Sequence, residues 1–151
     1  LLKYIYYFNY ISMDLKKNNA LKIELTNNIL LFTTLKNSIE EDEWRDCQLL
    51  VNEYYKFAET QNQEYGVIIN MSSISFLKPK FYINWKEKYL ENKNNSEKYV
   101  FAACVIIHNF FIRHFVNMFF TVYKLNKPFK LVKNLKEGYE FINKYKSPEL
   151  I

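Results

Sequence analysis

The long apolar stretch at residues 99–123 most constrains how this chain folds. A stretch of this length either crosses a bilayer or contains two buried elements. Residues 99–107 form an unbroken apolar run, as in a strand covered on both faces. After it, Asn109, Arg113 and Asn117 recur every four residues, which is the spacing of a polar stripe on a helix. We therefore predict a central strand followed by a helix, and no membrane span. The opposite, apolar face of that helix carries Phe111, Phe115, Met118 and Val122.

A β-hairpin is predicted near the start of the chain. Residues 21–25 alternate apolar and charged side chains, which is the period of a half-covered strand. Asn27 and Asn28 favour a turn, and residues 29–34 form the second strand. The polar residues 14–20 are predicted to be a loop.

Helices and strands alternate through the rest of the chain. Ser38 and Glu41 fit a capping box, and apolar residues recur behind them at helical spacing. The predicted elements are a helix at 39–61, a strand at 65–70, a helix at 78–92, a loop at 92–96, the strand and helix of the apolar stretch, a strand at 129–132 and a helix at 135–144. The order is β-β-α-β-α-β-α-β-α.

This order predicts a single α/β domain with a mixed sheet of about five strands, because alternating strands and helices form parallel crossovers. We place the domain at 21–146, an N-terminal extension at 1–20 and a C-terminal tail at 147–151. Met13 is a candidate natural start, so the residues before it are candidates for non-native sequence. An alternative for residues 1–12 is an aromatic arm that docks on a membrane interface or a partner.

Residues 69–77, Ile-Asn-Met-Ser-Ser-Ile-Ser-Phe-Leu, resemble the third strand and following loop of the anti-sigma-factor antagonist (STAS) domains. Residues 129–145 are similar to the closing strand and helix of that family. The resemblance implies a STAS-like fold and a non-enzymatic role in protein interaction or regulation.

One departure from the family changes what the resemblance implies. STAS domains continue with a segment of the type Asp-Ser-Ser-Gly, in which a phosphorylated serine controls partner binding. Residues 78–81 here read Lys-Pro-Lys-Phe, so the acceptor hydroxyl is missing. Nearby serines are either loop caps or a displaced phosphorylation site. The candidate interaction residues at this switch-loop position are Ser72, Ser73, Ser75, Lys78 and Lys80.

No catalytic, metal or cofactor site is predicted. His108 and His114 lie six residues apart, which does not match the spacing of helical metal ligands. Cys47 and Cys104 lack a base with an orienting partner. The acids of residues 40–46 suit the first turns of a helix, and two glycines in the whole chain are too few for a phosphate-binding loop. The distant cysteines favour reduced thiols in a cytoplasmic protein, with a disulfide as the alternative.

Charge divides the chain into two halves. Residues 1–70 carry seven basic and ten acidic side chains, whereas residues 71–151 carry fourteen basic and six acidic ones. A Lys-rich half could bind nucleic acid or another anionic surface. Arginine is scarce, however, and the abundance of Lys, Asn, Ile, Tyr and Phe indicates an AT-rich genome, such as that of a large DNA virus or a parasite. The candidate basic patch is Lys86, Lys88, Lys124, Lys127, Lys130 and Lys133.

The sequence thus predicts a domain that binds a protein partner or itself. Two alternatives stay open. One is binding of nucleic acid or an anionic surface by the Lys-rich half. The other is a lipid or small-molecule carrier with a pocket among Phe81, Trp85, Phe111 and Phe115.

Overall fold

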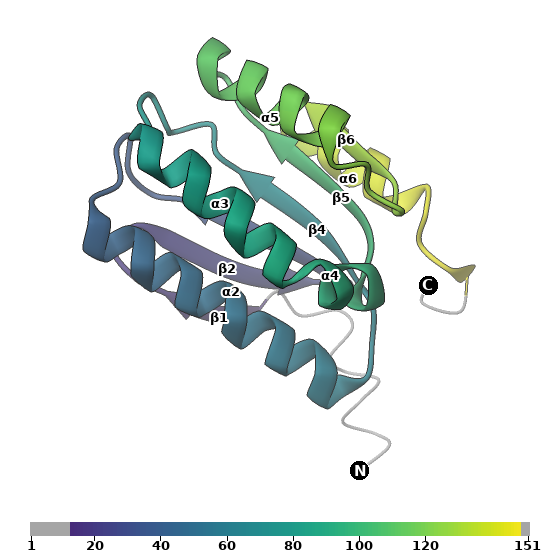
Figure 1. Ribbon diagram of the computed structural model, residues 1–151. Coiled ribbons are helices and arrows are strands. Elements are labelled where there is room, and N and C mark those ends of the chain that lie inside the picture. The colour runs from purple at the N-terminus through teal and green to yellow at the C-terminus, as the bar shows by residue number, and fades with distance from the viewer. Residues whose placement is uncertain (1–12, 149–151) are drawn as a thin grey trace.

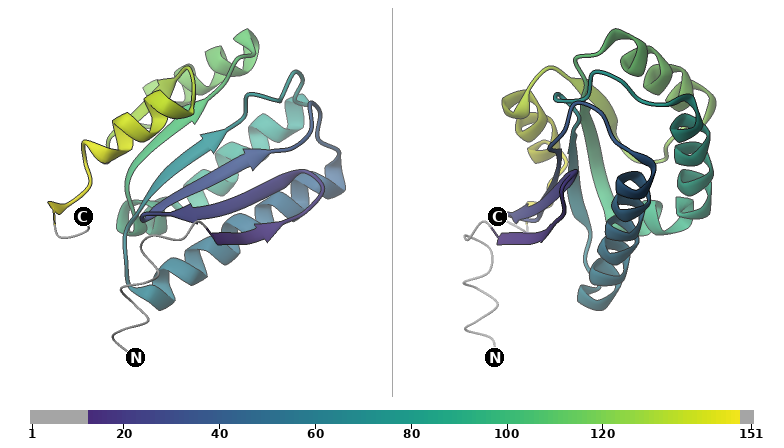
Figure 2. Two further views of the ribbon diagram at one scale, coloured as in Figure 1. Left: turned by 180° about the vertical axis from the view of Figure 1, so that it is seen from behind. Right: turned by 90° about the vertical axis from the view of Figure 1, so that its left-hand side faces the viewer.

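The computed structural model describes residues 13–148, in which one six-stranded sheet lies between layers of helices (Figures 1 and 2). The elements are β1 Met13–Lys17, β2 Leu21–Thr26, β3 Ile29–Thr34, α2 Glu41–Gln61, β4 Tyr65–Asn70, α3 Pro79–Glu91, α4 Lys93–Tyr99, β5 Val100–Ile106, α5 Phe110–Val122, β6 Phe129–Val132 and α6 Leu135–Asn143.

The strands lie side by side in the order in which they occur in the chain. β1, β2 and β3 pair antiparallel, and β3, β4, β5 and β6 pair parallel. Crossovers between parallel strands are right-handed, so strands added in one direction place their connecting helices on one face. Helices α2, α3, α4 and α5 accordingly cover one face, and α6 folds back onto the other (Figure 2).

The core is buried on both faces of the central strands. Under α2 to α5 it is rich in aromatic and aliphatic side chains, among them Tyr54, Phe81 and Val116. Under α6 the side chains of Ile68 and Ile142 are fully buried. The central strands are therefore covered on both sides, as their unbroken apolar runs predicted.

The predicted fold class is confirmed. The sheet is mixed, the hairpin of β2 and β3 lies to one side of the parallel strands, and β4 and β5 are central. Three strands have the predicted bounds, at 29–34, 65–70 and 129–132. The sheet has one strand more than the five or so expected.

The additional strand is β1, at residues where a loop was predicted. It pairs antiparallel with β2, with Met13 opposite Leu25 and Lys17 opposite Lys22. An edge strand is held by backbone hydrogen bonds to one neighbour and tolerates a polar sequence. The polar composition of 14–20 was therefore a poor guide to its backbone conformation.

The predicted loop at 92–96 was also wrong, because α4 occupies Lys93–Tyr99. Asparagine and serine have low helix propensity, which favoured a loop. In the structure the Asn92 side-chain amide donates to Lys88 O at the end of α3, over 3.0 Å. At the other end of α4, Tyr99 is buried and its carbonyl oxygen accepts a hydrogen bond from the Tyr54 hydroxyl at 3.1 Å. Tertiary packing thus outweighs propensity.

Helix α2 begins two residues later than its predicted cap implies. Its N-cap is Glu40, whose amide donates to the Glu43 carboxylate at 3.0 Å. Ser38 precedes the helix, and Ile39 is buried in the core beneath it.

The apolar face predicted for α5 is not the buried one. The buried residues are Ile112, Val116 and Phe119, whereas Phe111 and Met118 are exposed. Because α5 is apolar around most of its circumference, the sequence period did not identify which stripe faces the sheet.

In the part of the chain that the structure describes, no helix is long and apolar enough to cross a membrane. The arm proposed for residues 1–12 lies outside the described residues.

Candidate functional site

The carboxyl ends of the parallel strands form one edge of the sheet, and the loops that follow them meet there. In open α/β sheets this edge is the usual position of a binding site. It holds the switch loop, residues 71–78 after β4, and the short turn that leads from β5 into α5.

The serines of the switch loop contact the end of β3 and the chain that follows it. The Ser73 hydroxyl oxygen lies 2.8 Å from Thr34 O, and Ser75 Oγ donates to Asn37 O at 3.2 Å. Ser72 is half-buried in the same loop. The contacts of Ser73 and Ser75 are those expected of residues that cap backbone groups in a loop.

The two lysines of the switch-loop position form ion pairs with α2. Lys78 Nζ lies 2.8 Å from a carboxylate oxygen of Glu40, and Lys80 pairs with Glu41. Positive charge at the start of α3 opposes the helix dipole, and these glutamates offset it. The same glutamates lie at the start of α2, where acids are favourable, so the pairs join the first turns of two helices.

The six lysines of the candidate basic patch lie on a helix, a loop and an edge strand. They are Lys86 and Lys88 in α3, Lys124 and Lys127 between α5 and β6, Lys130 in β6 and Lys133 just after it. Lys88 pairs with Glu91 at 2.9 Å, and Lys127 lies 3.8 Å from Glu64. Part of their charge is therefore compensated by nearby acids.

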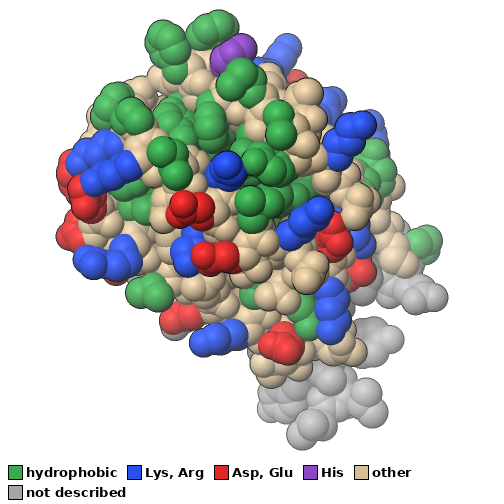
Figure 3. Space-filling model, in the orientation of Figure 1, with side chains coloured by type: hydrophobic (Ala, Val, Ile, Leu, Met, Phe, Trp, Pro, Cys, Tyr) green, Lys and Arg blue, Asp and Glu red, His purple; other side chains and the backbone are tan. Residues whose placement is uncertain are grey.

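Three exposed phenylalanines project from the edge that carries the switch loop. Phe76 is 57% exposed, Phe110 74% and Phe111 78%, and we call these three residues the aromatic rim. The rings of Phe110 and Phe111 meet edge to face, with centroids 5.8 Å apart. Figure 3 shows apolar side chains gathered at the top of the molecule, where α5 begins.

Asn109 fixes the aromatic rim to the switch loop. Its side-chain amide donates to Ser75 O at 2.7 Å, beside Phe76. Its side-chain oxygen caps α5 by accepting from the Ile112 amide at 3.0 Å. One residue thus positions both parts of the rim, and the motif Asn-Phe-Phe was a signal for it that sequence reasoning missed.

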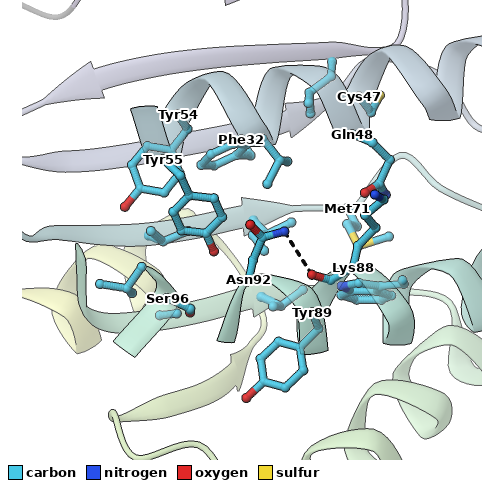
Figure 4. Close-up of a pocket in the computed structure, with 18 of the residues that line it drawn as sticks. Phe32, Cys47, Gln48, Tyr54, Tyr55, Met71, Lys88, Tyr89, Asn92 and Ser96 are labelled. Carbon is cyan, nitrogen blue, oxygen red and sulfur yellow. Dashed lines mark hydrogen bonds between the residues drawn. The ribbon is translucent and has the colours of Figure 1, made fainter. Parts of the chain in front are cut away.

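A cavity of about 240 Å³ lies on the same face of the sheet, beneath α2, α3 and α4 (Figure 4). It differs from the pocket predicted among four aromatic residues. Trp85 lines the cavity, but Phe81 is buried against Trp44, with ring centroids 4.8 Å apart. Phe111 belongs to the aromatic rim, and Phe115 packs on Tyr82.

The cysteines lie on opposite faces of the sheet. Cys47 packs in the layer of α2, Cys104 packs in the layer of α6, and both are free thiols. Burial raises the pKa of Cys47 to about 11 and that of Cys104 to about 12. Both thiols are therefore protonated at neutral pH, which is unfavourable for a nucleophile.

The histidines are engaged separately. His108 Nε2 lies 3.1 Å from Lys133 O, and His114 stacks on Phe110. Among residues 13–148 no group of three or more histidine, cysteine or acidic side chains is placed to hold a metal ion.

Cys47 should react slowly in the folded protein. With its pKa near 11 instead of 9.0, its thiolate fraction at pH 8 is about 100-fold lower than in the unfolded chain. We expect alkylation by iodoacetamide, followed by intact mass, to be slower by about that factor, and to accelerate about tenfold per pH unit up to pH 11. A Cys104→Ser variant isolates the Cys47 signal. Equal rates for folded and guanidinium-unfolded protein at pH 8 would contradict this assignment.

Comparison with known proteins gives one structural likeness. An uncharacterized protein of the DUF3478 family from Shewanella loihica, described as having a SpoIIAA-like fold, superimposes with a TM-score of 0.55. The match covers 85% of this chain and 98% of the other, at 13% sequence identity. The fold is STAS-like. No family model and no curated protein matches the sequence. In this sheet the switch loop follows β4 and lies at the carboxyl edge of the parallel strands.

Proposed function

We propose that this STAS-like domain is a non-enzymatic interaction domain that docks a protein partner on the aromatic rim. The observation that carries the proposal is the exposure of Phe76, Phe110 and Phe111 at the edge of the sheet that carries the switch loop. Large exposed apolar groups mark interaction sites on soluble domains, and aromatic residues are over-represented among those that dominate binding.

The hydrogen bonds that hold the loop before Phe76 favour binding. The Ser75 amide donates to Asn37 O at 2.9 Å, and the Ser75 carbonyl accepts from Asn109 at 2.7 Å. The loop before Phe76 is therefore bonded on two sides. A surface that is already ordered loses less conformational entropy when a partner binds.

We further propose that binding proceeds without the phosphorylation usual in STAS domains. Ser73 and Ser75 are engaged with the chain after β3, and Lys78 and Lys80 pair with acids of α2. The raised pKa of both thiols supports a role without catalysis.

The test compares two double variants that each remove two exposed apolar side chains. Phe110→Ser with Phe111→Ser alters the aromatic rim, and Leu49→Ser with Val122→Ser alters comparably exposed positions outside it. We expect a partner captured by the parent from its source cells to be retained by the control and lost by the rim variant. Light scattering at two salt concentrations would identify a second copy as the partner. Equal capture by all three proteins would refute docking on the rim.

Binding of nucleic acid or an anionic surface has less support. Among the basic-patch candidates, Lys88 and Lys127 have acidic partners, and Lys78 and Lys80 at the start of α3 are paired as well. The acids next to these lysines lower the net positive charge of this surface, on which the attraction of a phosphate backbone depends.

A further inference from the structure

The cavity has the form of a small-molecule site. Its floor is the helix-covered face of the sheet, and its walls are α2 on one side and α3 with α4 on the other (Figure 4). The walls are mainly apolar, as in ligand-binding pockets of other proteins. Aromatic residues that line it include Phe32, Trp44, Tyr54, Tyr55, Trp85 and Tyr89, and Phe120 of α5 and Phe129 of β6 line it as well.

Hydrogen bonds between helices flank the cavity. At one end, Trp44 Nε1 in α2 donates to Asn84 Oδ1 in α3 at 2.8 Å. At the other end, the Tyr54 hydroxyl donates to Tyr99 O at the end of α4. These hydrogen bonds tie α2 to α3 and to the end of α4.

Polar side chains gather on the more exposed side of the cavity. Gln48 comes from α2, whereas Lys88, Asn92 and Ser96 come from α3 and α4, and all four are partly exposed. The Asn92 amide is bonded to Lys88 O, as the dashed line in Figure 4 marks. Among the described residues that line the cavity, Lys88 is the only charged one.

We propose that this cavity binds a small carboxylate with an apolar body, of the size of a medium-chain fatty acid. The volume of about 240 Å³ lies near the lower end for small-molecule pockets, which suits a ligand of roughly ten non-hydrogen atoms. The apolar walls receive the body, and the lone cation on the exposed side pairs with the carboxylate. Lys88 now pairs with Glu91 at 2.9 Å, an exposed contact that a ligand can replace.

Tryptophan fluorescence provides a direct readout, because both tryptophans of the chain, Trp44 and Trp85, line the cavity. Titration with sodium octanoate should give a saturable change. Octanol, which has the same chain and no charge, should bind about tenfold more weakly. Acetate, which lacks the apolar body, should give no saturable change. A linear response to octanoate up to millimolar concentration would overturn the proposal.

Variants test separately the apolar walls, which receive the body of the ligand, and Lys88, which pairs with its carboxylate. Ala103→Leu on β5 and Val51→Phe on α2 fill the cavity from two walls and should each abolish binding. Lys88→Gln should weaken octanoate about tenfold and leave octanol unchanged. Lys86→Gln removes the same charge from α3 outside the cavity and is the matched control. Full octanoate binding by both filling variants, each shown to be folded by its thermal transition, would overturn the site. Equal effects of the two lysine variants would overturn the carboxylate assignment.

Discussion

Gly66→Ala is expected to lower the free energy of unfolding by about 3 kcal/mol, near the upper end for overpacking of a core. Gly66 lies in β4 directly beneath α6. A Cβ there would overlap Ile142 Cγ2 and would lie 3.0 Å from Phe101 Cζ. Ile142 is fully buried on α6, so relief requires movement of the whole helix rather than of one side-chain end.

Gly138→Ala is the matched control, because it adds the same methyl group to the other side of this contact. Its Cβ would lie 3.3 Å from Cys104 Sγ and 3.5 Å from Ile68 Cδ1, close to ordinary packing. Alanine also favours helix α6 by up to about 1 kcal/mol. We expect a net change within about 1 kcal/mol in urea unfolding followed by circular dichroism. Similar losses for both variants would show that α6 tolerates no added volume anywhere.

The fold could be predicted because each central strand carries its own signal. The unbroken apolar runs of β4 and β5 are possible only where both faces are covered, and the alternation in β2 matches a face covered on one side. The elements that were missed lack such a signal. β1 depends on its neighbour's backbone, and α4 depends on the burial of Tyr99.

Periodicity alone did not locate the aromatic rim, because α5 is apolar on most sides. Periodicity identifies a buried stripe only when the opposite face is polar, and here Phe110 and Phe111 adjoin the buried Ile112. The cavity has a different origin. It depends on the distance at which Trp44 and Asn84 hold two helices, and no local pattern in the sequence encodes that distance.

Both proposed sites follow from the strand order. Because β3 to β6 are added in one direction, α2, α3 and α5 crowd onto a single face. The cavity lies between two of these helices, and the aromatic rim lies where the third begins. The opposite face is covered by α6, whose packing on β4, β5 and β6 stabilises the sheet without contributing to either site.

Ile142→Ala should therefore lower stability strongly while leaving both sites intact. Ile142 is 0% exposed and packs against Ile68, Ala102 and Val132. Truncating a buried isoleucine in this way costs about 4 kcal/mol, from lost apolar burial and from the cavity left behind. Octanoate binding and partner capture, measured well below the unfolding transition, should stay within about twofold of the parent. Loss of either activity in the folded variant would show that α6 is coupled to the helix-covered face.

Combining this substitution with Gly66→Ala tests the proposed clash directly. Ile142→Ala removes the Cγ2 atom that the new methyl group would meet. In that background Gly66→Ala should cost about 1 kcal/mol instead of about 3, so the two changes are expected to be non-additive by about 2 kcal/mol. The measurement is a double-mutant cycle from urea unfolding of the four proteins. Additive costs would mean that the strain at Gly66 comes from Phe101 or from the strand itself, and not from the contact between α6 and the sheet.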